Sequence, residues 1–115
     1  MNMFVLINDK EYPLEVKITS KGKSQGMMGR NKLNGGMLFL FDEPKEQSFW
    51  MKNCLIPLDI VFLKQGVITK IHSNCEPCNQ QDCVKYTGYG DMVLEFVGGF
   101  SDENMLKVGD KLSFK

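Results

Sequence analysis

Four side chains between residues 72 and 83 could bind a metal ion or carry thiol chemistry. They are His72, Cys75, Cys78 and Cys83, spaced as His-x2-Cys-x2-Cys-x4-Cys. A Cys-x2-Cys pair on a turn can present two thiolates to a tetrahedral zinc ion, and His72 or Cys54 could complete the four ligands. The second Cys-x2-Cys pair of many zinc sites is missing. A local disulfide, or free thiols that hold down a long loop, is therefore favoured, and zinc is the alternative.

A second group of polar side chains lies within the apolar stretch formed by residues 49–63. Lys52 and Asp59 carry charges there, and an isolated buried charge is costly, so they either pair or serve a site. Alternation places Trp50 and Lys52 on one face of their strand, and Asp59 can lie near Lys52 or Asn53 across a short turn. Such a pair could bind an anion or polarise a carbonyl group. It could also only satisfy polar groups at the end of a hairpin, which is the favoured interpretation.

Two charged residues outside this stretch complete the candidate ligand-binding set. Arg30 could supply a further anion contact, although a guanidinium group at the surface is its simpler role. Glu95 lies in an apolar strand expected at residues 92–97. The full set is Trp50, Lys52, Asn53, Asp59, Arg30 and Glu95.

Several enzyme classes find little support in the sequence. A single histidine excludes multi-histidine metal centres and argues against a Ser-His-Asp triad. There is no Gly-x4-Gly-Lys loop for nucleotide phosphates and no Gly-x-Gly-x2-Gly after a strand. Thiol–disulfide catalysis would suit an activated thiol at a helix N-terminus, but residues 79–82, Asn-Gln-Gln-Asp, predict no helix.

Composition indicates one domain, residues 1–115, of an ordinary soluble globular protein. The chain is 43% hydrophobic and 24% charged. Its 14 basic residues balance 14 acidic ones, which argues against nucleic acid as a partner. The first residues hold too few consecutive apolar positions for a signal peptide or a membrane span. We therefore expect the protein to be cytoplasmic. In the cytoplasm, cysteines are more often reduced or bound to metal than joined in disulfides.

The pattern of apolar residues predicts short strands separated by turns. In one of them Leu14, Val16 and Ile18 alternate with polar residues, as in a half-buried strand. The expected strands are 4–7, 14–19, 37–41, 48–53, 58–64, 67–72, 92–97 and 111–114, and the expected helices are 20–29 and 101–106. We expect 48–53 and 58–64 to form an antiparallel pair, and 73–91 to be a long polar loop. The fold class is α+β, mainly β: a curled antiparallel sheet or barrel-like single domain with two short helices.

Several motifs occur in the order and spacing of one family. They are Gly26-Met-Met-Gly-Arg30, Gly36-Met-Leu-Phe-Leu-Phe41, Phe49-Trp-Met-Lys-Asn53, Pro57-Leu-Asp-Ile60, Glu76-Pro-Cys78, Cys83 with Tyr86, Val93-Leu-Glu95, Gly99 and Gly109-Asp110. Over residues 4–114 the chain thereby resembles the bacterial and archaeal family called domain of unknown function 192. The resemblance implies a compact, mainly β single domain, often exported or lipid-anchored in bacteria, with no established catalytic residue.

The chain departs from the family pattern at three points. It lacks the usual export signal, which argues against an envelope location. It has Cys54 where the family more often has threonine, and Cys75 where alanine is common. Cys78 and Cys83 do match the family, so a link between them is the family-type alternative to a metal site.

We interpret the chain as a binding module without chemistry of its own. Its site is expected in the groove around Trp50, Lys52, Asn53 and Asp59, with residues 73–91 as the rim. The partner is a small polar, sugar-like ligand or a protein. Two alternatives stay open: an accessory structural subunit of a larger assembly, or a small metal- or thiol-dependent enzyme.

Overall fold

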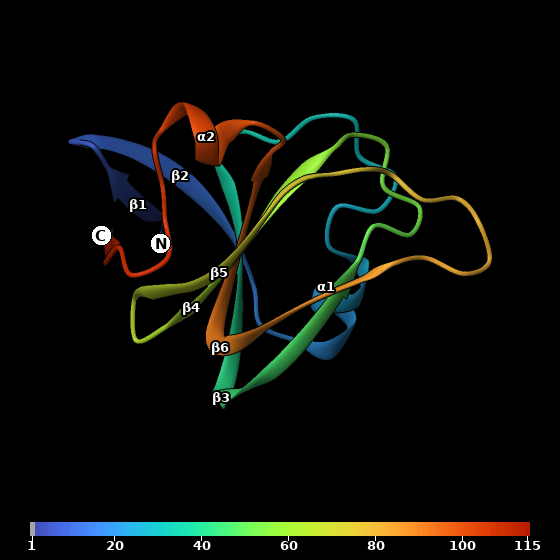
Figure 1. Ribbon diagram of the computed structural model, residues 1–115, viewed down its shortest axis with the longest axis horizontal. Helices are drawn as coiled ribbons and strands as arrows, with labels where there is room; N and C mark the ends of the chain where they lie inside the picture. The colour runs from blue at the N-terminus through green and yellow to red at the C-terminus, as the bar shows by residue number, and fades with distance from the viewer. Residues whose placement is uncertain (1) are drawn as a thin grey trace.

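The computed structural model describes residues 2–115, which form seven strands and two short helices (Figure 1). In chain order the elements are β1 (Met3–Ile7), β2 (Lys10–Lys17), α1 (Ser20–Gln25), β3 (Gly36–Trp50), β4 (Leu58–Lys64), β5 (Val67–Cys75), β6 (Lys85–Val97), α2 (Phe100–Glu103) and β7 (Ser113–Phe114). The predicted curled, mainly β single domain with two short helices is confirmed.

All seven strands belong to one sheet in the order β5-β4-β6-β3-β2-β1-β7. Every pair is antiparallel except β2 with β3, which are parallel because the long connection through α1 carries the chain across to the same end of the sheet. The two ends of the sheet meet. The Leu112 amide donates to the Gly66 carbonyl (2.8 Å) and the Ile68 amide to the Asp110 carbonyl (2.9 Å), which gives the sheet its barrel-like curl.

The longest strands were not expected from the sequence. β3 runs through the polar residues 42–47, and a register shift against β6 between Leu40 and Lys45 accommodates Pro44 within the strand. β6 begins at Lys85, so the predicted loop 73–91 shrinks to residues 76–84. The sequence prediction was wrong here because polar segments that contain proline usually form loops. In the structure, residues 42–47 instead extend β3, which pairs with the first part of β6.

The predicted pairing of 48–53 with 58–64 is also wrong. β4 lies between β5 and β6, and the last part of β3 pairs instead with the start of β6. Glycines in β6 allow the close approach of β4: a Cβ at Gly88 would lie 2.4 Å from Cγ of Phe62, and one at Gly90 only 2.1 Å from the Leu63 carbonyl oxygen. These contacts join residues that are far apart in the chain, whereas the prediction considered only the pairing of strands that follow one another in the sequence.

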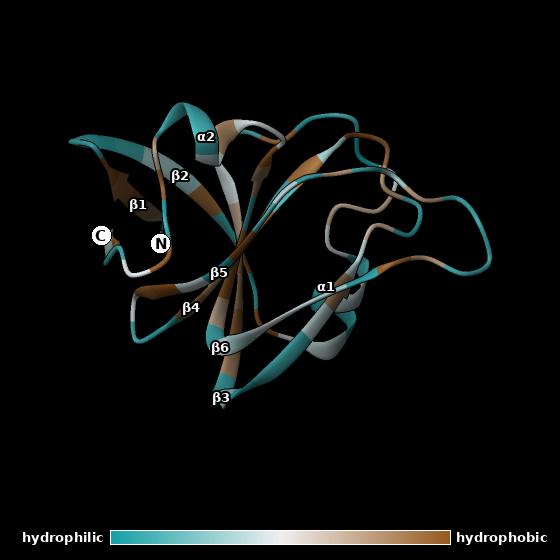
Figure 2. Ribbon diagram, in the orientation of Figure 1, coloured by the Kyte–Doolittle hydropathy of each residue, from teal (hydrophilic) through white to brown (hydrophobic). Residues whose placement is uncertain are grey.

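The apolar parts of the central strands β3, β4 and β6 (residues 36–39, 58–63 and 93–96) are buried on both faces, and Figure 2 shows hydrophobic residues along these strands. One face packs Leu38, Val61 and Leu94 inside the curl of the sheet. The other packs Phe39 and Phe62 with Met27, Ile60 and the thiols of Cys54 and Cys75. Since side chains alternate between faces, Asp59 of β4 enters the first layer and Glu95 of β6 the second.

Asp59 is fully buried and its carboxylate is satisfied by backbone amides. It accepts hydrogen bonds from the amides of Asn74 (2.8 Å), Gly99 (3.1 Å) and Ser101 (2.8 Å). Gly99 is the N-cap position of α2 and has no side chain, so Asp59 supplies the acceptor that a capping residue would give. The expected pairing of Asp59 with Lys52 or Asn53 is wrong, because three amide donors already compensate its buried charge.

We expect Asp59→Asn to lower the free energy of unfolding by about 3 kcal/mol, because an amide offers one acceptor oxygen and turns its own donors toward backbone N–H groups. Urea unfolding measures this. Asp102→Asn, exposed on α2, is the matched control and should be nearly neutral. Equal stability of the two variants would contradict the structural role of Asp59.

Candidate functional site

A cavity of about 300 Å³ lies between residues 23–28 and the face of the sheet that carries Phe39. Its walls are rich in aromatic side chains, with two lysines near the opening and one acid within. The lining residues are Lys23, Ser24, Gln25, Gly26, Met27, Met28, Phe39, Phe41, Gln47, Ser48, Phe49, Trp50, Lys52, Cys54 and Glu95. A concave site with apolar walls and few polar groups is typical of a small-molecule pocket.

Glu95 is the buried acid of this cavity. It lies near the C-terminal end of β6, paired with Met37 of β3 on one side and Ile60 of β4 on the other. Its side chain is only 4% exposed, and its Oε1 has no hydrogen-bond partner among residues 2–115. Burial raises the pKa of Glu95 to about 8, so the carboxyl group holds a proton at neutral pH.

Two free thiols lie close to Glu95 in the same core layer. Burial raises the pKa of Cys54 to about 11, and the charge that Glu95 can carry adds to this shift. Burial also raises the pKa of Cys75 to about 11, and the charges of Asp59 and Glu95 add to this shift. Both thiols are therefore protonated at neutral pH, the opposite of an activated nucleophile.

Trp50, Lys23 and Lys52 form the opening of the cavity. The Trp50 side chain is 43% exposed, and Nζ of Lys52 and of Lys85 lie 5.9 Å and 5.8 Å from its ring centroid. Lys52 Nζ donates to the Gln80 carbonyl (2.8 Å). Lys23 Nζ donates to the Leu40 carbonyl (2.7 Å) and lies 4.2 Å from the Phe41 ring centroid. The opening is thus both aromatic and cationic.

Of the predicted ligand-binding residues, Trp50, Lys52 and Glu95 line the cavity, whereas Asn53, Asp59 and Arg30 do not. The exposed Asn53 joins segments through its backbone: its amide donates to the Cys78 carbonyl (2.9 Å), and its carbonyl accepts from the Gly29 amide (2.8 Å). A positive φ of 60° is common for asparagine in such a tight turn.

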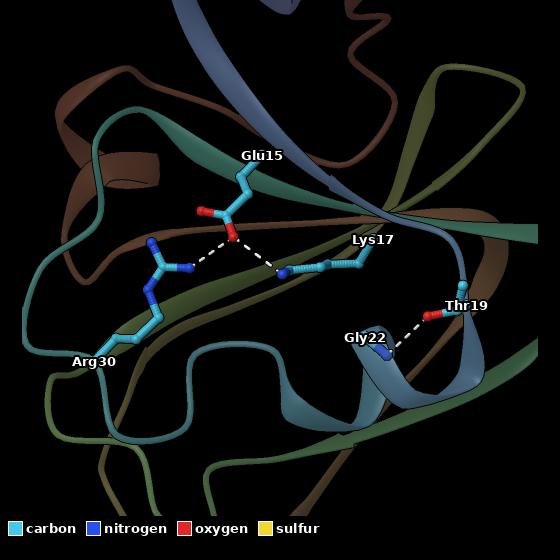
Figure 3. Close-up of polar contacts among 5 residues, drawn as sticks. All are labelled: Glu15, Lys17, Thr19, Gly22 and Arg30. Atoms are coloured by element: carbon cyan, nitrogen blue, oxygen red, sulfur yellow. Dashed lines mark hydrogen bonds and ion pairs between the residues drawn. The ribbon is translucent and has the colours of Figure 1, made fainter.

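Arg30 forms an ion pair away from the cavity. Its Nη1 lies 2.7 Å from Oε2 of Glu15, and Lys17 Nζ lies 3.0 Å from the same oxygen (Figure 3). The hydrogen bond from Arg30 holds the pKa of Glu15 below its usual range. The same view shows Thr19 capping α1, with its side chain accepting a 3.0 Å hydrogen bond from the Gly22 amide.

The predicted rim, residues 73–91, does not line this cavity. Part of it surrounds a separate hollow of about 220 Å³ lined by Met51, Glu76, Pro77, Cys78, Asn79, Gln80, Asp82, Val84 and Tyr86. A disulfide joins Cys78 to Cys83 across this loop. The hydrogen bond from Lys52 to Gln80 connects the loop to the opening of the larger cavity.

The four residues proposed as metal ligands are not gathered around a common point. Cys78 and Cys83 are bonded to each other, whereas Cys75 is a buried free thiol. His72 places Nε2 2.8 Å from the Thr87 carbonyl. Within residues 2–115, no group of three or more His, Cys, Asp or Glu side chains is arranged to hold a metal ion, so zinc gains no support.

Sequence reasoning missed the aromatic wall and the contribution of α1. Phe39 and Phe41 alternate along β3, and Phe49 packs edge-on against both rings, at centroid distances of 4.9 Å and 6.4 Å. That alternation is visible in the sequence, but phenylalanines at such spacing are typical of an ordinary hydrophobic core, and we interpreted them in that way. Lys23 gave no signal at all, because its place at the cavity depends on the crossover between β2 and β3.

Fold and cavity together define a small, mostly β domain in which one curled sheet carries an aromatic-walled pocket. The chain belongs to the domain of unknown function 192 family, described as an uncharacterized ACR, whose model matches residues 3–114. No curated protein matches the chain.

Two solved structures resemble the whole domain. One is a protein from Sinorhizobium meliloti 1021 titled a "putative transcription regulator", with a TM-score of 0.84 and 27% identity over 98% of this chain and 92% of that chain. The other is a protein of unknown function from Novosphingobium aromaticivorans DSM 12444, with a TM-score of 0.81 and 30% identity over 98% of this chain and 84% of that chain. In the described part of the chain, neither helix has the length and apolar character needed to cross a membrane.

The two free thiols provide a test of the thiol-enzyme alternative. We expect iodoacetamide at neutral pH to leave Cys54 and Cys75 of the native protein largely unlabelled, because both are buried and protonated. Mass spectrometry after unfolding without reductant should then find these two thiols labelled, and only added reductant should expose Cys78 and Cys83. Rapid labelling of native Cys54 would restore the thiol-enzyme alternative.

The raised pKa of Glu95 predicts a stability that falls as pH rises. The unfolded chain releases this proton near the ordinary value of 4.5, whereas the folded protein holds it until about 8, so folding takes up a proton between these values. We expect the free energy of unfolding, measured against Glu95→Gln, to fall by about 1.4 kcal/mol per pH unit in this window. Urea titrations of both proteins at several pH values measure the difference. A constant difference would mean that Glu95 is ionised in the folded state.

Proposed function

We propose that this chain is a binding module that holds a small polar ligand in the 300 Å³ cavity. The observation that carries the proposal is the carboxyl group of Glu95, which is buried at the cavity with an oxygen that has no protein partner. Polar groups inside folded proteins nearly always have a hydrogen-bond partner, so an orphan that faces a cavity indicates a place for a ligand donor.

The walls of the cavity support a ligand with a flat or ring-like apolar surface. Phe39, Phe41 and Phe49 form an edge-to-face cluster beside Trp50 at the opening. Rings of this kind can stack against sugars and heterocycles while a few polar groups set orientation. This combination of an aromatic surface and two kinds of polar anchor favours a small molecule over a macromolecular partner.

The chemistry of the cavity does not favour catalysis. Its thiol, Cys54, is protonated at neutral pH, and Glu95 stands without a second titratable group at hydrogen-bond distance. The word regulator in the name of the Sinorhizobium meliloti protein suits ligand sensing, but the balanced charge of this chain does not favour DNA binding. A cytoplasmic location and the role of an accessory subunit stay predictions.

Trp50 is the only tryptophan of the chain, so its fluorescence reports directly on the opening of the cavity. We expect a cavity ligand, found by thermal-shift screening of sugars, nucleosides and amino acids, to change Trp50 emission and raise the melting temperature. Lys52→Ala should weaken binding of an anion-bearing ligand roughly tenfold, the size of one charge-assisted contact.

Lys70→Ala is the matched control for this experiment, because Lys70 is exposed on β5 and does not line the cavity. The control should bind like the unmodified protein. A screen in which no compound shifts melting or changes Trp50 emission would overturn the proposed function, as would equal effects of both substitutions on every ligand found.

A further inference from the structure

The charges of the cavity are ordered by depth. Glu95 lies on the central strand β6 and is 4% exposed, whereas Lys52 is partly exposed beside Trp50 at the opening. An acceptor oxygen without a donor therefore lies deep in the site, and cationic donors lie near the solvent. A complementary ligand presents donors to the inside and an anionic or acceptor group to the outside.

We propose that the cavity selects amino-acid-like zwitterions, whose protonated amine binds at Glu95 and whose anionic group binds at the lysine-bearing opening. This inference rests on the proposed function and names the ligand class for the same site. An ammonium group has three donors and no acceptor, which matches a carboxylate that has no protein donor at Oε1. The rings of Phe39 and Phe49 leave an apolar wall for the stem of the ligand and favour a cation near their faces.

Glu95 is the group of the cavity whose charge changes near neutral pH. The groups around it are the Cys54 thiol from the turn after β3, the Cys75 thiol from β5, and Lys23 and Lys52 along the walls. Both thiols have a pKa of about 11 and stay neutral there. Asp59, on the adjacent strand β4, enters the opposite face of the sheet and is held by three amides.

Binding of an amine must displace the proton that Glu95 carries in the free protein. Because the pKa of Glu95 is about 8, affinity for an ammonium ligand should rise almost tenfold from about pH 6 to about pH 7, rise less toward pH 8, and then level off. A neutral ligand that accepts the Glu95 proton would show the opposite trend, with affinity lost above pH 8.

The test uses isothermal titration with α- and ω-amino acids of about four to seven carbons, each compared with its deaminated and its N-acetylated analogue. We expect binding only where a free amine is present, tighter at about pH 8 than at about pH 6, with release of a proton at neutral pH. Glu95→Gln should weaken amine binding roughly 10- to 100-fold and abolish the pH dependence, because it removes the charge and keeps the shape.

Glu46→Gln is the matched control, because Glu46 is exposed on β3, a strand that contributes other residues to the cavity wall. This variant should bind normally. Glu95→Asp keeps a carboxyl group and should keep the preference for amines at lower affinity. If deaminated analogues or sugars bind the cavity and Glu95→Gln leaves them unaffected, the inference is wrong while the binding module stands. If no compound of any class binds, both the inference and the proposed function fall.

Discussion

Residues 36–39 of β3, 58–63 of β4 and 93–96 of β6 are covered on both faces, so an ionisable side chain within these segments must find partners inside the protein or face a cavity. Two acids meet this constraint in opposite ways. Asp59 of β4 enters one layer and receives three backbone hydrogen bonds, which fix the start of α2. Glu95 of β6 enters the other layer, where its Oε1 has no donor within residues 2–115 and its pKa rises to about 8.

This contrast indicates a structural role for Asp59 and is consistent with the ligand-binding role proposed for Glu95. The charge on Asp59 is fully compensated within the fold, so removing it should cost stability. Glu95 keeps its proton at a stability cost that grows with pH, and the fold gains no hydrogen bond at Oε1 in return. Glu95 thus costs stability at its own position beside the walls formed by Phe39 and Phe49, which supports the proposal that this cavity binds a ligand.

Much of the fold could be predicted from local patterns, and the rest depended on contacts between distant segments. Alternation at Leu14 and Val16 identified the second half of β2, although the strand begins at Lys10 and ends before Ile18, and the apolar run after Pro57 identified β4. The pairing of the end of β3 with the start of β6 could not be predicted from local patterns. Polar residues 42–47 resemble a loop, and β4 and β5 lie between the two paired segments in the chain. The parallel pairing of β2 with β3 likewise follows from the crossover, not from either strand alone.

The same limit applies to the site. Charges within apolar segments drew attention to Lys52, Asp59 and Glu95, and the structure places Lys52 and Glu95 at the cavity but not Asp59. Alternation fixes the face that a side chain enters, but it does not name its partners, and so Asp59 was paired with the wrong groups. Lys23 joins the cavity through the α1 crossover, which no spacing in the sequence indicates.

The function proposed for the cavity depends on Glu95 being a buried carboxylic acid that keeps its proton at neutral pH. The most direct measurement is an NMR titration of the ¹³C-labelled side-chain carboxyl carbon of Glu95, assigned by its disappearance from the spectrum of Glu95→Gln. We expect a midpoint near pH 8 in the ligand-free protein. A midpoint near the ordinary value of 4.5 would show that the carboxyl group is solvated or paired and is not the protonated group proposed at the cavity.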